Sequence, residues 1–281
     1  MGMTFLRRLN LPFILQRRCS FNRSYAAAAS EVRIVSLEGN IGCGKTTMWN
    51  YLKHQYASTA EVSFLREPVD LWQTSIRNAE GASLFQLYLN DPKKYGFPFQ
   101  LMVRLTRINL LQKQMKETPN AKVIVCERSL QADESVFAKM LHDQGFMDDV
   151  SYQVYSMLCK SWTEIPPLSM IIYLRATPEV CLQRIARRGR PGEAEGISLE
   201  YLKDCHSYHE DWILSMNHVE EKEVSIFNKN TSARSRVLIL DVNDDASSSI
   251  SQDDKKNGDI GKGMVVLGGN KITALINTLL L

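Results

Sequence analysis

The segment from Gly39 to Thr46 restricts the possible folds of this chain more than any other. It reads GNIGCGKT and matches the pattern G-x-x-x-x-G-K-[ST], in which glycines let backbone N–H groups point inward at phosphate oxygens. It lies between a β-branched run, Val32–Leu37, and a predicted helix, Thr46–Tyr56, which is the strand–loop–helix context that phosphate binding needs. Lys45 is expected to reach the β- and γ-phosphates and Thr46 to hold Mg²⁺. The segment therefore predicts a loop that binds a nucleoside triphosphate.

Short apolar runs alternate with helical periods along the rest of the chain. This alternation favours a parallel sheet that is covered on both faces. We therefore expect an α/β fold of the P-loop NTPase type, with three layers, a five-stranded parallel sheet flanked by helices, and an arginine-rich lid. After the first strand and helix, the predicted strands are Val62–Leu65, Lys122–Cys126, Met170–Leu174 and Arg236–Leu240. The predicted helices are Phe99–Lys116 after Pro98, Ser129–Leu141, Val150–Trp162, one starting at Thr177-Pro178, and Ser198–Ser215.

Residues 1–30 differ in composition from the remainder of the chain. They contain five arginines and no acidic residue, with Ser, Ala and scattered apolar residues between them. This composition is typical of an organelle transit peptide, and we expect import into the mitochondrial matrix. The alternatives are plastid import and a disordered basic arm on a cytosolic protein. Of the 34 basic residues, 29 remain without these five, against 31 acidic ones, so the net charge of +3 is no evidence for nucleic-acid binding.

The length of 281 residues suits one α/β domain with a tail, and we place that domain at residues 31–244. Residues 245–263 are rich in polar residues and glycine and are predicted to be a flexible linker. Residues 264–281 form a C-terminal extension in which Ile272–Leu281 is a predicted helix. No apolar run reaches the roughly 18 residues that cross a membrane, so we expect no membrane partner.

The six cysteines are scattered, and no pair is spaced as CxxC. This usage fits a reducing compartment and speaks against a disulfide framework or a zinc site. His206 and His209 are three residues apart on a predicted helix, which is a conceivable metal pair. Surface histidines on an amphipathic helix are the favoured interpretation.

Two glutamates follow predicted strands, at the edge where an open α/β sheet binds its ligands. Glu67 comes shortly after Val62–Leu65, where it is placed to accept a proton from an attacking hydroxyl or to cap a turn. Glu127 follows Cys126 and occupies the place of the acid that helps to hold Mg²⁺. Arg128 comes next and is placed to stabilise charge on a moving phosphoryl group, although an arginine after a strand is often part of a surface ion pair.

Several arginines crowd one short stretch after the fourth predicted strand. Arg184 and Arg188 are four residues apart and share a helix face, and glycine and proline then end the helix. A cationic segment next to such a break suits a lid that closes over phosphates, and the alternative is a solvated basic face. The stretch contains Arg184, Arg187, Arg188 and Arg190.

Taken in order, these motifs resemble those of the deoxyribonucleoside kinases. The resemblance covers roughly Val32–Asp244, and Leu240–Asp244 looks most like the deoxycytidine/deoxyguanosine branch. It implies ATP-dependent phosphorylation of a deoxyribonucleoside 5′-hydroxyl, Mg²⁺ as cofactor, and a homodimer without nucleic-acid partners. The matching segments are GNIGCGKTT at Gly39–Thr47, Glu67–Val69 with Trp72, Phe99-Gln100, Glu127–Ser129, the arginine stretch, Ile172–Leu174 with Thr177–Glu179, Leu199–Leu202 and His209–Trp212.

The resemblance also implies roles for single residues. Glu67 matches the general base that takes the 5′-hydroxyl proton, Arg128 the arginine beside that hydroxyl, and Glu127 the acid near Mg²⁺. The base pocket is implied by Gln100, which matches a glutamine that pairs with the base edge, and by the aromatic residues Trp72, Phe99 and Phe137. The implied ATP-binding residues are Gly39, Asn40, Ile41, Gly42, Cys43, Gly44, Lys45, Thr46 and Thr47 in the loop, Arg184, Arg188 and Arg190 in the lid, and Asp241, Val242 and Asn243 near the donor's base.

Gln100 and Arg107 lie seven residues apart, on one face of a predicted helix. Arg107 and Asp133 match a charged pair of the deoxycytidine and deoxyguanosine kinases, whereas thymidine-accepting relatives have uncharged residues there. A carboxylate only accepts hydrogen bonds, so it suits an exocyclic amine and repels the carbonyl oxygen of thymine. We therefore expect deoxycytidine or purine deoxynucleosides to be preferred over thymidine. The alternative is an ordinary structural ion pair.

The sequence departs from the family pattern on the sugar side of the pocket. The tyrosine that grips the sugar 3′-hydroxyl in the family aligns with Leu89, while Tyr88 sits beside it. Either the helix register shifts or that grip is lost. The lid glutamates are disturbed by one extra residue, so Glu193 or Glu195 is expected to touch the sugar.

Two other functions are compatible with parts of this pattern. A nucleoside monophosphate kinase would also carry a phosphate-binding loop, but its acceptor end needs extra cationic groups. A relative of the family serves as a non-catalytic subunit of a respiratory complex. The retention of Lys45, Thr46, Glu67 and Arg128 counts against that second alternative.

Overall fold

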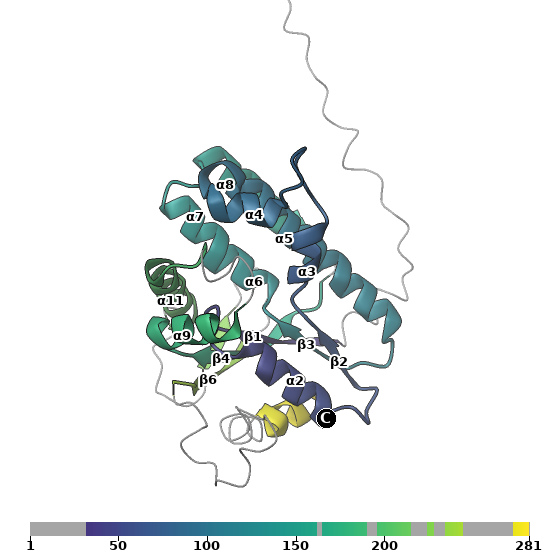
Figure 1. Cartoon of the computed structure of the whole chain (residues 1–281). Coiled ribbons are helices and arrows are strands. Elements are labelled where there is room, and N and C mark those ends of the chain that lie inside the picture. Colours follow the sequence, from purple (N-terminus) through teal and green to yellow (C-terminus); the bar gives the residue numbers. More distant parts are fainter. Residues whose placement is uncertain are drawn as a thin grey trace, which may run out of the picture.

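A single sheet of six strands forms the middle of the molecule (Figure 1). The computed structural model describes residues 32–161, 165–189, 196–214, 224–227, 234–243 and 272–280. The strand order is β2-β3-β1-β4-β6-β5, and every pairing is parallel except that of β5 with β6. The strands are β1 (Arg33–Glu38), β2 (Val62–Leu65), β3 (Val123–Glu127), β4 (Leu168–Arg175), β5 (Val224–Phe227) and β6 (Arg234–Asp241).

The five parallel strands confirm the predicted α/β fold, and each lies within two residues of its predicted bounds. β1 and β3 are buried almost throughout, because helices cover both faces of a parallel sheet. β5 was not predicted. Its four residues on the antiparallel edge are too few to display the alternating pattern of a half-buried strand.

Helices cover both faces of the sheet. α2 lies on one face, and the long α5 lies on the other with the short helices around it (Figure 1). Alternate residues of β1 point to opposite faces of the sheet. Val35 and Leu37 pack with α2, whereas Ile34 packs with residues of α5. The helices are α2 (Lys45–Gln55), α3 (Val69–Thr74), α4 (Leu84–Asn90), α5 (Pro92–Glu117), α6 (Leu130–Ala132), η1 (Asp133–Ala138), α7 (Lys139–Asp143), α8 (Asp149–Ser161), α9 (Pro178–Arg188) and α11 (Leu199–Leu214).

The prediction that the long helix α5 starts at Phe99 is wrong. It begins at Pro92, and Pro98 lies inside it. The Asp91 side chain accepts a hydrogen bond of 3.1 Å from the Lys94 N–H, and Pro92 occupies the first position, where a missing N–H costs nothing. The first proline therefore marks the helix start, whereas the second lies in the helix interior.

The helix predicted at Ser129–Leu141 is not a regular α-helix. Ser129 caps its start by accepting a hydrogen bond of 3.1 Å from the Ala132 N–H, but η1 is a π-helix. Such wider turns are frequent at functional sites and leave little trace in sequence periodicity. The short α4 was also not predicted, although Ser83 and Gln86 form a capping box at its start that the sequence does display.

Residues 272–280 form the helix that the sequence predicts near the C-terminus, and this helix packs beside α2 (yellow in Figure 1). Ile272 and Ile276 are fully buried in the cluster that also contains the apolar residues of α2. The Tyr56 hydroxyl lies 2.9 Å from the side-chain oxygen of Asn277. No helix among the described residues is long and apolar enough to cross a membrane.

Candidate active site

A cavity of about 600 Å³ opens at the carboxyl ends of the parallel strands, where open α/β sheets bind ligands. This volume is in the range that accommodates small-molecule ligands. Apolar and aromatic side chains line one part of the cavity, and charged side chains line the other. Its polar lining consists of Lys45, Thr46, Thr47, Asn50, Arg66, Glu67, Asp70, Gln100, Arg107, Glu127, Arg128, Asp133, Arg184, Arg187 and Arg188.

The phosphate loop connects β1 to α2 and has the backbone conformation that its glycines allow. A Cβ atom on Gly39 would lie 2.4 Å from the carbonyl oxygen of Leu174, and Gly39 has a φ of +135° that other residues rarely adopt. Lys45 is buried, and its Nζ donates hydrogen bonds of 3.1 Å and 2.7 Å to the carbonyls of Gly39 and Asn40. The lysine therefore binds the backbone of its own loop, and it also lines the cavity.

Thr46 and Glu127 come together from α2 and from the end of β3. The Thr46 hydroxyl donates a hydrogen bond of 2.5 Å to Glu127 Oε1, and both side chains line the cavity. A hydroxyl oxygen beside a carboxylate supplies the hard oxygen ligands that Mg²⁺ prefers. These two residues therefore fit the magnesium site that the loop pattern predicts.

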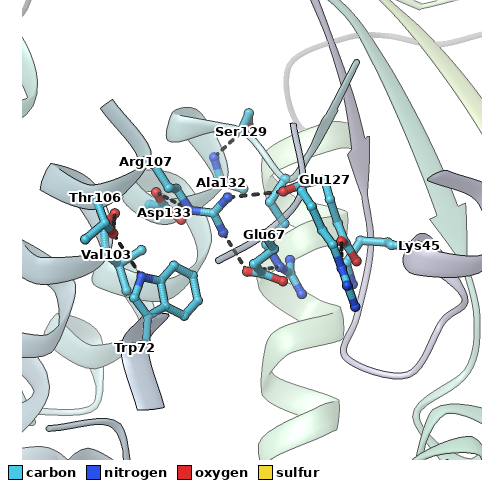
Figure 2. Close-up of polar contacts among 12 residues, drawn as sticks. Lys45, Glu67, Trp72, Val103, Thr106, Arg107, Glu127, Ser129, Ala132 and Asp133 are labelled. Carbon is cyan, nitrogen blue, oxygen red and sulfur yellow. Dashed lines mark hydrogen bonds and ion pairs between the residues drawn. The ribbon is translucent and has the colours of Figure 1, made fainter. Parts of the chain in front are cut away.

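Glu67 lies just beyond β2 and contacts two arginines, of which Figure 2 labels Arg107. Its Oε1 is 2.6 Å from Nη2 of Arg107 and 3.4 Å from Nε of Arg128. Burial acts to raise the pKa of Glu67, but the charges of Arg107, Arg128 and Lys45 outweigh it, and the pKa lies below its usual value. Glu67 is therefore ionised at neutral pH, and both arginine contacts use the same carboxylate oxygen.

Arg128 follows β3 in a conformation that is unusual for its type. Its φ is +67°, in the left-handed region, and its side chain is almost fully buried. The backbone N–H donates a hydrogen bond of 3.1 Å to the Leu37 carbonyl, which fixes the turn after β3 against β1. The guanidinium lies 4.7 Å from the ring centre of Phe137. The local backbone thus directs Arg128 back across the sheet edge toward Glu67.

Arg107 links three parts of the site. Besides Glu67, its Nη1 donates a hydrogen bond of 3.1 Å to the Glu127 carbonyl, and its Nε lies 3.2 Å from Oδ2 of Asp133. The contact with Asp133 is an ion pair without hydrogen-bond geometry. Burial raises the pKa of Asp133 to about 6, although Arg107 and Arg104 act in the opposite direction.

Gln100 lies two turns before Arg107 on the same face of α5 and is almost fully buried. Its side-chain oxygen has no hydrogen-bond partner, although buried amide oxygens are nearly always paired. Gln100 also lines the cavity. The unpaired oxygen is therefore available to a ligand with a hydrogen-bond donor.

An aromatic cluster forms the apolar part of the cavity. Tyr88 stacks on Phe99 with ring centres 4.4 Å apart and planes 8° apart, and Trp72 meets Phe99 edge-on at 6.0 Å. The Trp72 Nε1–H donates a hydrogen bond of 2.9 Å to Thr106, which satisfies its polar atom. Flat aromatic rings beside an unpaired amide oxygen suit a planar heterocycle.

Tyr88 and Leu89 both line the cavity, but only Tyr88 has a polar side-chain group that can form a hydrogen bond. The Tyr88 hydroxyl lies 3.5 Å from the Tyr201 hydroxyl, which comes from α11. Leu89 faces Gly196, where an added Cβ atom would lie 3.3 Å from its side chain. A tyrosine hydroxyl therefore reaches the site from the position before Leu89.

The arginines of α9 line the cavity from the side of the phosphate loop. Arg184 donates hydrogen bonds of 3.4 Å to the Cys43 carbonyl and 2.8 Å to the Val242 carbonyl, so it connects the loop to the end of β6. Arg187 and Arg188 also line the cavity. The predicted residues Arg190, Glu193 and Glu195 lie outside the described residues.

Asp241, Val242 and Asn243 do not line this cavity. The Val242 N–H donates to the Arg175 carbonyl, and the Asn243 side chain accepts a hydrogen bond of 2.7 Å from the Thr177 N–H. These contacts tie the end of β6 to the start of α9. Arg184 links this segment to the phosphate loop.

Sequence reasoning missed two buried polar residues that contact the segment Glu127–Ser129. Glu38 at the end of β1 accepts a hydrogen bond of 2.8 Å from the Ser129 N–H, and its other oxygen has no partner. The sequence did offer a signal for Glu38, because it is a single acidic residue at the end of an apolar run. The surface interpretation of the histidine pair is wrong for His209, which is fully buried. Among the residues that the structure describes, no group of three or more His, Cys, Asp or Glu residues lies close enough together to hold a metal ion.

Comparison with known proteins identifies a family model, described as "Deoxynucleoside kinase", that matches residues 35–260. Deoxycytidine kinase from Homo sapiens is 34% identical over 212 residues, which cover 68% of this chain and 80% of that protein. Deoxycytidine kinase from Mus musculus is 30% identical over 247 residues, covering 79% and 88%. The mitochondrial deoxyguanosine kinase from Xenopus laevis is 30% identical over 259 residues, covering 86% and 93%.

Proposed function

The chain belongs to the deoxynucleoside kinase family and is a kinase, and we propose that it transfers the γ-phosphate of ATP to the 5′-hydroxyl of deoxycytidine or a purine deoxynucleoside. Thymidine is the poorer substrate in this proposal. The observation that carries it is the placement of Glu67, between Arg107 and Arg128, in the same cavity as Lys45. A carboxylate that can act as the general base and a lysine that can bind phosphate thus line the same small-molecule site.

Glu67 is the general base of the proposed reaction. It is ionised at neutral pH, because the neighbouring arginines lower its pKa. Both arginines contact Oε1, so we assign Oε2 to the 5′-hydroxyl proton. Arg128 then lies beside the attacking oxygen and stabilises the charge that develops as the phosphoryl group moves.

The donor triphosphate is bound by the phosphate loop in this proposal. The backbone N–H groups of the loop and Lys45 bind the phosphates, while Arg184 and Arg188 approach from α9. Thr46 and Glu127 would hold Mg²⁺, which neutralises charge between the β- and γ-phosphates when bound. Replacing Glu127 with glutamine should raise the Mg²⁺ concentration needed for half-maximal activity.

The base preference rests on Gln100 and Asp133. The unpaired Gln100 oxygen and the Asp133 carboxylate are both hydrogen-bond acceptors, so together they suit a base edge that carries an exocyclic amine. Arg107 holds Asp133 in place and adds a donor. Thymine offers a carbonyl oxygen where the amine would lie, and it would meet the carboxylate unfavourably. Turnover of thymidine faster than the other three deoxynucleosides would contradict this assignment.

The decisive experiment incubates the full chain with Mg-ATP and each of the four deoxynucleosides and separates the products by chromatography. Lys45→Ala should lower turnover by about 100-fold or more, because a preorganised charge on the phosphates is lost. Glu67→Gln should lower it by about 10²- to 10⁴-fold and still bind nucleoside. Glu117→Gln, on the exposed end of α5, is the matched control. Full activity of the Glu67 variant would remove it as the base.

The expected homodimer has a candidate surface on α8. Val150, Val154 and Met157 recur at helical spacing, and their side chains are exposed although they are large and apolar. Exposed apolar groups that share one face mark contact surfaces. A second copy of the chain would cover this face by a two-fold contact in which each α8 meets the other.

Residues 1–30 lie outside the described residues, and we propose that they direct the chain to mitochondria. Their arginine-rich, acid-free composition supports this, as does the similarity to a relative described as mitochondrial. A fusion of residues 1–30 to a fluorescent protein should locate to mitochondria in eukaryotic cells. The same fusion with the five arginines replaced by glutamine should remain in the cytosol, and mitochondrial signal from that variant would contradict the proposal.

A further inference from the structure

His209 is a fully buried titratable residue that the proposed reaction does not use. It lies on α11, which comes much later in the chain than the ends of β2 and β3, and none of its side chain is exposed. Its Nε2 nonetheless lies 3.2 Å from Nη1 of Arg128. A histidine therefore contacts the arginine that is assigned to the acceptor hydroxyl.

The protonation of this histidine follows from its partners. Nδ1 lies 2.6 Å from the Cys205 carbonyl oxygen, which can only accept a hydrogen bond, so Nδ1 carries the hydrogen. Nε2 then carries a lone pair and no hydrogen, and Nη1 of Arg128 donates a hydrogen bond to it. Burial, with the charge of Arg128, holds the pKa of His209 well below its usual value, which agrees with a neutral ring.

Aromatic side chains hold the imidazole ring in place. Tyr173 of β4 stacks on it with planes 7° apart, and Phe137 of η1 meets it edge-on, with ring centres 6.0 Å apart. Phe137 also lies under the guanidinium of Arg128. With its ring fixed on two sides, His209 presents its lone pair in one direction.

We propose that His209 is a positioning residue that orients Arg128 for phosphoryl transfer by accepting a hydrogen bond from its Nη1. The proposal rests on the proposed function, because it assumes that Arg128 acts on the acceptor hydroxyl. Arg128 has an unusual backbone conformation and a long side chain, so its guanidinium needs a second fixed point beyond Glu67. His209 supplies that point without adding charge.

Two substitutions separate this role from packing. Glutamine can place an oxygen at the position of Nε2, and asparagine can place an amide near the position of Nδ1. His209→Gln thus keeps an acceptor for Arg128 and loses the bond to Cys205, whereas His209→Asn does the reverse. We expect His209→Asn to lower kcat by about 10- to 100-fold with little change in nucleoside KM. His209→Gln should retain most of the activity.

The reverse order, with His209→Asn active and His209→Gln impaired, would show that the bond to Cys205 matters and would overturn the proposal. Equal losses in both variants, in step with lowered unfolding midpoints, would do the same. A second comparison uses Arg128→Ala as the background. There His209→Asn should cost no further activity, because its effect passes through Arg128, and an undiminished further loss would contradict the proposal.

A crystal structure of His209→Asn provides a readout that is independent of activity. The guanidinium of Arg128 should leave the position seen here, and an unmoved guanidinium would refute the inference. Absence of any phosphorylated product with the unaltered chain would instead refute the proposed function. An active chain whose His209→Asn variant is equally active would refute the positioning role alone.

Discussion

At the scale of single residues, Asp133 is the proposed hydrogen-bond acceptor for the base, and its charge should respond to pH. Its pKa is raised to about 6 by burial, so it loses its charge as the pH falls through that value. The neutral form is a poor acceptor for an exocyclic amine. We expect kcat/KM for the best aminated nucleoside to fall about tenfold per pH unit below pH 6. Asp133→Asn should lack this acid limb, and a limb that persists in the variant would assign it to another group.

Most residues expected at the site lie around one cavity, because two simple rules place them. Strand ends bring Glu67 and Glu127 to one edge of the sheet, and the helical period aligns Gln100 with Arg107. Tertiary packing decides the rest. The sequence of α11 does not reveal which of its faces is buried, and His209 was therefore misread.

At the scale of elements, the helix at 272–280 is expected to stabilise the fold without taking part in the reaction. Its Ile276 is fully buried against the layer that contains α2. Ile276→Ala should lower the free energy of unfolding by about 2–5 kcal/mol, measured by thermal or urea denaturation. The exposed Thr278→Ala should change it by about 0.5 kcal/mol or less. Turnover well below the unfolding temperature should stay unchanged in both, since the helix meets α2 near Tyr56 and not at Lys45.

The elements that sequence reasoning placed correctly have a strong period or a strong boundary signal. Among the five parallel strands, β1 and β3 are buried runs that contain β-branched residues, and both the phosphate loop and α9 carry their own start signals. η1 lacks such a signal, because a π-helix leaves little trace in the spacing of apolar residues. β5 is too short to show a period.

At the scale of the whole molecule, the exposed face of α8 predicts self-association. Met157→Glu should shift the chain from dimer to monomer, because a charge would be buried in the contact. Sedimentation velocity across a range of protein concentrations measures this shift. Ile76→Glu is the matched control, since Ile76 is also a large exposed apolar residue but follows α3 in the chain and is not part of α8. A dimer that persists in Met157→Glu would place the contact elsewhere.

The strand order β2-β3-β1-β4-β6 makes the site a product of long-range pairing. β1 pairs with β3, where Arg33 lies opposite Val123, so Thr46 meets Glu127 only after two strands far apart in the chain have paired. Such non-local pairing is slow compared with helix formation. A refolding chain should therefore recover its helical circular dichroism before it recovers nucleoside binding. Once formed, the complex should also protect the entire sheet, since a ligand that binds only the native state raises the stability of all of it.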